Sequence, residues 1–239
     1  MSLSVAGMTK RESIDIKKGG RAAFARVDAF IQEKISKGRS GLTGLLKAGA
    51  DGGRMIKKPF SYIETFISDA GVAAIHPSSK YLVSRVMRAV EQGRPRVVVE
   101  FGAAEGVITK KILKSLASDG VLIAIERNDN FYERLLEMRD ARLRTAQGDV
   151  RNMKHILAGL GVEKADCFVS GIPFSFFSAA ERSALVHDVY SNLAPGGRFV
   201  AYLCTTHLIP LFRRHFQQVK VELELRNIPP HFVFTAIKK

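Results

Sequence analysis

The sequence predicts an α/β domain with a mostly parallel β-sheet, preceded by a basic helical segment. From Arg94 onward, short apolar runs alternate with amphipathic stretches of about 10 to 14 residues, a pattern typical of parallel strands with helices on both faces. The last two apolar runs alternate residue by residue around Asn227–Pro230, which indicates an antiparallel pair. Residues 1–60 carry 13 basic and 5 acidic side chains, against 24 and 18 in the rest of the chain, so the two parts differ in character.

The first segment predicts a basic amphipathic helix. Phe24, Val27, Ile31 and Ile35 recur at helical spacing, while basic residues occupy the other sides, and glycines from Gly38 end the pattern. Such a segment is typical of proteins that bind an anionic membrane surface, and packing on the protein's own core is the alternative interpretation. We assign residues 1–58 to this basic helical extension and residues 59–239 to the α/β domain.

The remaining pattern predicts seven strands and the helices between them. The expected strands are 96–101, 121–126, 143–147, 166–172, 198–203, 219–226 and 232–237. The expected helices are one that starts after Pro77-Ser78-Ser79, then 107–116, one around Phe131–Leu136, 153–160 and 179–192.

Composition excludes several classes of protein. The 239 residues are enough for one domain with a sizeable core. The two cysteines, Cys167 and Cys204, lie in apolar runs without metal-ligand spacing, so we expect neither a disulfide scaffold nor a metal site. No apolar run approaches the length of a membrane span and the N-terminus does not resemble a secretory signal, so we expect a cytoplasmic protein. The net charge of +14 favours a polyanionic partner, either an anionic membrane or a nucleic acid.

A glycine-rich turn follows the first expected strand. It reads Glu100-Phe101-Gly102-Ala103-Ala104-Glu105-Gly106 and leads into a helix, whose N-terminus offers unpaired N–H groups. It lacks the Gly-Lys-Ser/Thr of a P-loop and the G-x-G-x-x-G of dinucleotide-binding folds. Taken alone, this turn is equally compatible with a ligand site and with a simple turn.

Two acidic residues end the next two strands. Glu126 is placed to accept hydrogen bonds from the two hydroxyls of a ribose, and Asp149 from an adenine amino group beside the Val150 backbone. The alternatives are a solvated carboxylate at Glu126 and a helix N-cap at Asp149. In a parallel sheet these strand ends meet at one edge, where ligands bind.

This ordered set resembles class I S-adenosylmethionine-dependent methyltransferases over about residues 75–239, and Ala194–Phe199 is similar to the turn into their fifth strand. The resemblance implies a Rossmann-like fold with a seven-stranded sheet. It also implies that S-adenosyl-L-methionine is the cofactor, with its methionine part held by Glu100, Gly102, Ala103, Ala104 and Gly106. Glu126 would then bind the ribose, and Asp149 and Val150 the adenine. Ala104 and Glu105 depart from the family pattern, which favours glycine and a small residue there.

Three further segments resemble bacterial phospholipid N-methyltransferases, which convert phosphatidylethanolamine towards phosphatidylcholine: residues 73–82, 166–174 and 226–233. We expect carbonyl and hydroxyl oxygens of the second segment to stabilise the positive charge that develops on a substrate nitrogen. These oxygens belong to Ser170, Gly171 and Ile172, whereas Pro173 is expected to fix the loop and Phe174 to form part of an aromatic wall. We expect the first segment to bind the lipid phosphate at a helix N-terminus, where the alternative for the serines is helix capping. The residues concerned are His76, Ser78, Ser79 and Lys80.

The sequence therefore predicts a peripheral membrane enzyme that methylates a phospholipid amine. An N-methyltransferase of rRNA or another nucleic acid is the second interpretation, because the charge and the Ser170–Phe174 motif suit it nearly as well. A non-catalytic lipid- or nucleic-acid-binding protein with a degenerate cofactor loop is the third, because of Ala104 and Glu105.

Overall fold

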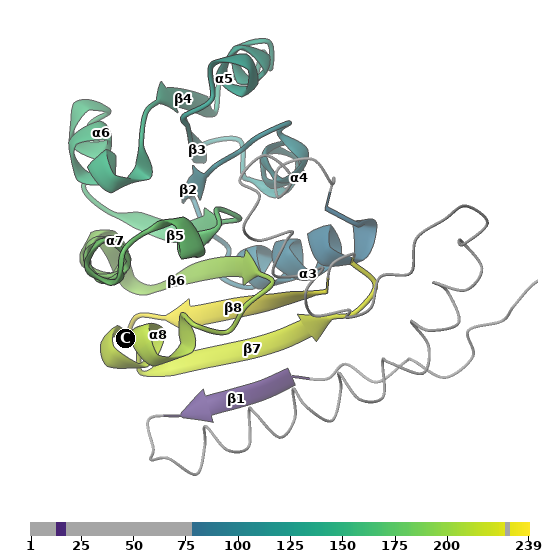
Figure 1. The fold of residues 1–239 in the computed structure, drawn as a ribbon. Coiled ribbons are helices and arrows are strands. Elements are labelled where there is room, and N and C mark those ends of the chain that lie inside the picture. Colours follow the sequence, from purple (N-terminus) through teal and green to yellow (C-terminus); the bar gives the residue numbers. More distant parts are fainter. Residues whose placement is uncertain (1–12, 18–77, 228–229) are drawn as a thin grey trace, which may run out of the picture.

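In the computed structural model, which describes residues 13–17, 78–227 and 230–239, the chain forms a mixed sheet with helices on both faces (Figure 1). The order of the strands across the sheet is β1-β7-β8-β6-β5-β2-β3-β4. The strands are β1 (Ser13–Lys17), β2 (Val97–Phe101), β3 (Val121–Glu126), β4 (Leu143–Gln147), β5 (Ala165–Ser170), β6 (Leu193–Leu203), β7 (Gln218–Glu224) and β8 (His231–Ile237). Strands β4, β3, β2, β5 and β6 run parallel, whereas β8 is antiparallel to β6 and β7.

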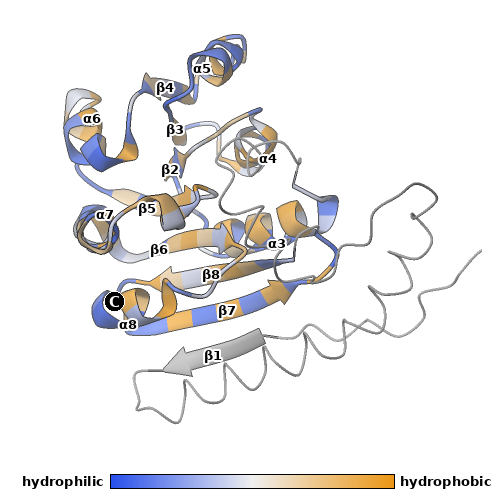
Figure 2. Cartoon of the chain, viewed as in Figure 1, coloured by the Kyte–Doolittle hydropathy of each residue, from blue (hydrophilic) through white to orange (hydrophobic). Residues whose placement is uncertain are grey.

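The helices form a layer on each face of the sheet. They are α3 (Lys80–Glu91), α4 (Val107–Ser115), α5 (Asp129–Leu136), α6 (Met153–Gly159), α7 (Ala179–Asn192) and α8 (Ile209–His215), with short 3-10 turns η1 (Val150–Asn152) and η2 (Phe174–Phe176). Residues of α3 and α4 pack with one face of the central strands, and residues of α6, α7 and α8 with the other. Figure 2 shows orange segments along α3, β6 and β8, whereas α5 is mostly blue and β7 alternates between blue and orange.

The predicted α/β architecture is confirmed, and all seven expected strands are present with ends that differ by a few residues. The fourth expected strand stops at Ser170, because Gly171 and Ile172 leave the sheet as a loop. The fifth starts at Leu193, so the turn that we expected at Ala194–Phe199 is itself paired with the sheet. The amphipathic helix predicted from Phe24 to Ile35 lies outside the described residues.

Strand β1 was not predicted. Its residues pair antiparallel with β7, from Ser13 opposite Glu222 to Lys17 opposite Gln218. It adds an edge strand to the seven expected ones, so the sheet has eight strands. Part of the segment that we assigned to the extension therefore joins the sheet of the domain. The boundary at residue 58 stays a prediction.

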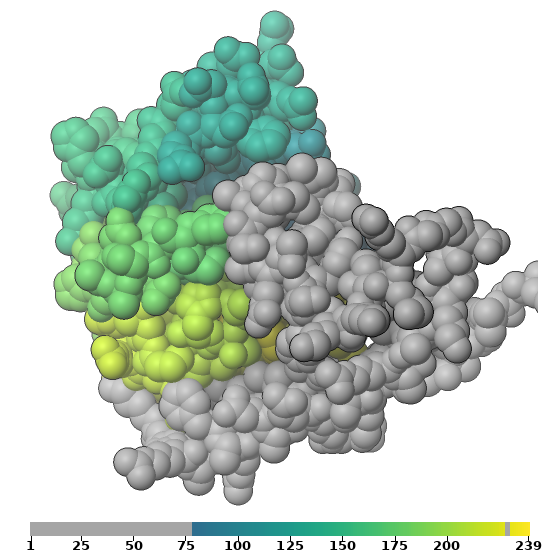
Figure 3. All heavy atoms as spheres, viewed as in Figure 1, coloured from purple at the N-terminus to yellow at the C-terminus, as the bar shows by residue number. Residues whose placement is uncertain are grey.

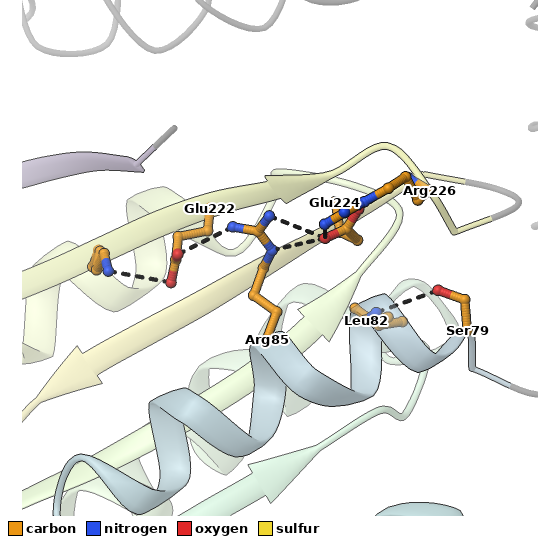
Figure 4. A network of polar contacts seen from close by, with 7 residues as sticks. Ser79, Leu82, Arg85, Glu222, Glu224 and Arg226 are labelled. Carbon is orange, nitrogen blue, oxygen red and sulfur yellow. Dashed lines mark hydrogen bonds and ion pairs between the residues drawn. The ribbon is translucent and has the colours of Figure 1, made fainter. Parts of the chain in front are cut away.

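A buried ion network joins α3 to β7 (Figure 4). The guanidinium of Arg85 donates from Nη1 to Glu222 Oε1 at 3.1 Å and from Nη2 to Glu224 Oε2 at 3.0 Å. Arg226 donates from Nε to Glu224 Oε1 at 2.8 Å on the other side. Burial alone would raise the pKa of Glu224, but the hydrogen bonds from Arg226 and Arg85 outweigh it and lower the pKa to about 2. Because the network pins α3 to β7, it also fixes where the N-terminus of α3 lies.

The space-filling view places the helices that follow β3 and β4 at the opposite end of the molecule from β7 and β8, in agreement with the strand order (Figure 3). Among the helices that the structure describes, none is both long and apolar enough to cross a bilayer.

Candidate active site

A cavity of about 750 Å³ opens at the carboxyl edge of the parallel strands. Its size falls within the range of about 300 to 1,000 Å³ for small-molecule sites. It is lined by loops after five strands and by the ends of α3 and β8, including Ser78, Gly102, Ala103, Ala104, Glu105, Glu126, Asp149, Val150, Gly171, Ile172, Pro173, Phe174, Tyr202, Asn227 and His231. Segments from both halves of the domain therefore converge on one site.

The glycine turn after β2 has the backbone conformation that its sequence indicated. Gly102 has a φ of +70°, and a side chain there would place Cβ 2.6 Å from Ile172 Cγ2. Gly106 has a φ of +73° and begins α4 without a side-chain cap. Ala104 adopts a left-handed φ of +47° despite its methyl group. The turn thus keeps the shape of a cofactor loop even though alanine replaces its second glycine.

Glu126 holds this turn in place. Its Oε2 accepts a hydrogen bond from the Ala104 N–H at 2.9 Å, and its Oε1 accepts from the N–H groups of Arg127 and Asn128, both at 2.8 Å. A carboxylate has about four acceptor positions, so three are used and one remains. Glu126 lines the cavity, and its contact with a ribose stays a prediction.

Asp149 caps the 3-10 turn η1 and binds an arginine. Its Oδ1 accepts from the backbone N–H of Arg151 at 2.9 Å, and its Oδ2 accepts from Arg151 Nη2 at 2.7 Å. These hydrogen bonds lower the pKa of Asp149, so the group stays an anion at the cavity wall. The N-cap alternative is therefore present in the structure, and the adenine contact stays a prediction.

Glu105 lines the cavity and lies beside an arginine. Its carboxylate lies 3.6 Å from Arg134 Nη1, and about half of its side chain is exposed. Arg134 therefore offsets part of the negative charge that Glu105 brings to the cavity.

Glu100 is buried behind the glycine turn and not at the cavity surface. It is buried at the end of β2, and its Oε2 accepts a hydrogen bond from Thr109 Oγ1 at 2.7 Å. Burial raises the pKa of Glu100 to about 7, against the lowering effect of Thr109, and the charge of Glu126 adds to the increase. Glu100 does not line the cavity, so the structure gives it no direct contact with a ligand there.

The loop after β5 forms the opposite wall. Gly171, Ile172, Pro173 and Phe174 line the cavity, and the guanidinium of Arg182 fixes the loop by donating to the Phe177 carbonyl at 2.8 Å. Phe176, with 49% exposure, lies at the cavity wall, whereas Phe174 is buried with its ring 6.0 Å from that of Phe177.

Ser170 does not reach this cavity. It is fully buried, and its hydroxyl has no hydrogen-bond partner among the described residues. It lies in register with Phe101 and Ala201, whose side chains belong to the core on the α6–α8 face. The expectation that its hydroxyl meets the substrate is therefore not met, because the alternation along β5 turns this side chain into the core.

Of the residues at the start of α3 that were expected to bind the head group, only some lie at the cavity. Ser78 lines the cavity, whereas Ser79 is the N-cap whose Oγ accepts from the Leu82 N–H at 3.3 Å. Lys80 is exposed, with Nζ 5.3 Å from the centre of the Tyr81 ring, and it does not line the cavity. His76 lies outside the described residues.

Three residues that the sequence analysis gave no role complete the wall beside Ser78. The Oδ1 of Asn227 accepts from the Ser79 N–H at 2.8 Å, and its Nδ2 lies 3.0 Å from His231 Nδ1. Tyr202, near the end of β6, faces the cavity across Gly171. Since Tyr202 lies one residue before the end of an expected strand, the rule that ligands bind at strand ends would have drawn attention to it.

The residues present fit S-adenosylmethionine. Gly102, Ala103 and Ala104 of the glycine turn line the cavity, Glu126 keeps one acceptor position, and Asp149 with Val150 follows the next strand. The described residues contain no group of three histidine, cysteine or acidic side chains placed to hold a metal.

Comparisons with known proteins agree with this geometry. No family model matches the chain. Ornithine lipid N-methyltransferase of Singulisphaera acidiphila is 36% identical over 168 residues, which cover 69% of this chain and 88% of the relative.

Solved structures with the same fold include two methyltransferases. An O-methyltransferase of Bacillus cereus in complex with SAH superposes with a TM-score of 0.55 at 13% identity, over 77% of this chain and 93% of that one. A 16S rRNA methyltransferase of Thermus thermophilus, in complex with AdoMet and guanosine, gives 0.53 at 18% identity, over 69% of this chain and 44% of that one.

Proposed function

Since the chain belongs to the family of S-adenosylmethionine-dependent N-methyltransferases that includes ornithine lipid N-methyltransferase, we propose that it methylates the head-group amine of a lipid at a membrane surface. The chain has the class I methyltransferase fold and uses S-adenosylmethionine. The proposal concerns the substrate.

One observation carries the proposal. Each of the three segments that resemble lipid N-methyltransferases contributes to the same cavity, through Ser78, through Gly171–Phe174 and through Asn227 with His231. These segments are far apart in the sequence, and they meet where the cofactor loops also end. A shared substrate explains their convergence on one wall.

The cofactor would occupy the side of the cavity that is lined by the loops after β2, β3 and β4. The Gly102–Gly106 turn would hold its amino acid part, Glu126 one ribose hydroxyl, and Asp149 with Val150 its adenine. When bound, S-adenosylmethionine supplies a methyl carbon whose bond to sulfur breaks as the bond to the substrate nitrogen forms.

The protein's task is to position a neutral amine and to tolerate the charge that develops on it. The Gly171–Pro173 loop exposes backbone at the cavity, and carbonyl oxygens there stabilise positive charge without reacting. Proline at 173 restricts Ile172 to extended conformations, so the loop is pre-organised. The aromatic rings of Phe176 and Phe177 lie on the same wall and favour an alkylated ammonium or an acyl chain.

The anionic part of the head group would bind at the start of α3. Ser78 places a hydroxyl at the cavity beside the helix N-terminus, where the helix dipole favours an anion, and Lys80 adds positive charge nearby. The net charge of +14 would attract the protein to anionic lipid.

The substrate assay compares two amine lipids. The full-length protein is incubated with S-adenosylmethionine and vesicles that contain either phosphatidylethanolamine, as the sequence predicted, or ornithine lipid, as the relative's name suggests. Mass spectrometry of the extracted lipid then reports methylation. We expect methylated product from at least one of these lipids, and no product from either contradicts the proposal.

A nucleic-acid N-methyltransferase is the second candidate, because the charge of +14 equally suits a phosphate backbone. Methylation of RNA in place of lipid would support this candidate.

A further inference from the structure

The side chain of Tyr202 lies across the end of the neighbouring strand. Tyr202 belongs to β6 and packs against the core on the α3–α4 face. A Cβ atom at Gly171, just after β5, would overlap both the hydroxyl and the Cζ atom of Tyr202. Gly171 therefore leaves the space that the tyrosine hydroxyl fills, directly beside the Gly171–Pro173 loop.

The hydroxyl of Tyr202 is available to a ligand. Tyr202 lines the cavity, and within the described part of the chain no group hydrogen-bonds its hydroxyl. Burial raises the pKa of this phenol, and the charge of Glu100 raises it further. The phenol therefore stays neutral at physiological pH, and it is suited to hydrogen bonding rather than to removing a proton.

We propose that the Tyr202 hydroxyl accepts a hydrogen bond from an N–H of the substrate nitrogen and thereby aligns the nitrogen lone pair for methyl transfer. This inference rests on the proposed function, because it requires an amine substrate. The Tyr202 hydroxyl keeps its own proton throughout.

The hydrogen bond depends on how many methyl groups the nitrogen already carries. The substrate ammonium first loses a proton to solvent. A neutral primary amine then has two N–H bonds, a secondary amine has one, and a tertiary amine has none. After each of the first two transfers the charged nitrogen again loses one proton to solvent. Tyr202 therefore assists the first and second transfers but has no N–H to bind in the third.

The test replaces the hydroxyl alone, with Tyr202→Phe in the full-length protein. Tyr132→Phe is the matched control, because Tyr132 lies on α5 and does not line the cavity. Vesicles carry the unmethylated, monomethyl and dimethyl forms of phosphatidylethanolamine or of ornithine lipid, and kcat/KM is measured for each form. If the wild type does not methylate one of these forms, that lipid is instead tested as an inhibitor of the methylation of another form, and its inhibition constant is compared between wild type and variant.

We expect Tyr202→Phe to lower kcat/KM about three- to tenfold for the unmethylated and monomethyl lipids, the effect of one neutral hydrogen bond, and to leave the dimethyl lipid within about twofold. Tyr132→Phe should change none of the three values. The ratio between the three lipids does not depend on the fraction of folded protein, so it remains informative for an unstable variant.

An equal loss on all three forms, or no loss, overturns the role of Tyr202 while the proposed function stands. No turnover of either lipid by the wild type instead contradicts the proposed function, and the role of Tyr202 falls with it.

Discussion

Asp149 has two tasks that one substitution cannot separate, because its carboxylate both caps η1 and faces the cavity. Asp149→Ser keeps a side-chain oxygen for the Arg151 N–H but removes the carboxylate, whereas Asp149→Ala removes both. If the carboxylate contacts the adenine, both variants weaken cofactor binding by about 1 to 3 kcal/mol. Calorimetric titration measures this, and normal affinity in the serine variant would leave Asp149 as a cap only.

Glu100 makes stability depend on pH. Its pKa is about 7 in the folded protein and 4.5 without perturbation, so the folded state retains a proton that the unfolded state releases between these values. The contribution is fully present below about pH 4.5 and is lost as the pH rises towards 7, by up to about 3 kcal/mol. Glu100→Gln should remove this loss, so the variant becomes more stable than the wild type as the pH increases from 5 to 8.

Denaturant unfolding at several pH values measures the effect, with the exposed Glu137→Gln as the control. Parallel stability curves for wild type and Glu100→Gln would contradict the buried, protonated state of Glu100.

Among single residues, the sequence indicated which side chains stand at strand ends but not where they point. Gly102, Glu126 and Gly171 could be placed at the cavity because chain order fixes strand ends. The burial of Ser170 depends on the register of β5 between β2 and β6, which the local sequence does not contain. The ion pair of Glu105 with Arg134 likewise depends on a contact between the glycine turn and helix α5, which are separate in the sequence.

The start of α3 offers a matched pair of substitutions at the level of the element. Ser79→Ala removes the N-cap and should lower the free energy of unfolding by about 1 kcal/mol with little change in the KM for lipid. Ser78→Ala should do the opposite, raising the KM for lipid several-fold with little effect on stability or on cofactor binding. Thermal unfolding and steady-state kinetics measure both, and a lipid KM that rises equally in the two variants would contradict an anion site at Ser78.

The strands and helices from α3 onward could be predicted because their apolar periodicity is strong. The regular alternation in β7 and β8 indicated an antiparallel pair, which the pairing of Val219 with Ala236 confirms. Strand β1 was missed, since Ser13–Lys17 offers only two apolar residues within a charged segment. Its pairing is set by the exposed edge of β7, far away in the sequence.

At the scale of the whole molecule, the basic N-terminal segment should determine membrane affinity. Replacing Arg21, Arg26, Lys34 and Lys37 with glutamine removes four charges from the predicted amphipathic helix. At roughly 1 kcal/mol per charge near the surface, and with about half of them facing lipid, binding to vesicles with anionic lipid should weaken more than tenfold. Raising the salt concentration should reduce the difference between variant and wild type.

Vesicle sedimentation measures this binding, with Lys110, Lys111 and Lys114 on α4 changed to glutamine as the control. An equal loss in binding free energy per charge removed in the two variants would show that net charge alone, and not the N-terminal segment, brings the protein to the membrane.

The central claim is that the convergent cavity serves a lipid amine, and transfer of a labelled methyl group tests it most directly. Methyl-labelled S-adenosylmethionine is supplied to the full-length protein together with total lipid and total RNA in one reaction, and the two fractions are then separated. We predict label in an amine-containing lipid and none in RNA. Label in RNA alone would contradict the account.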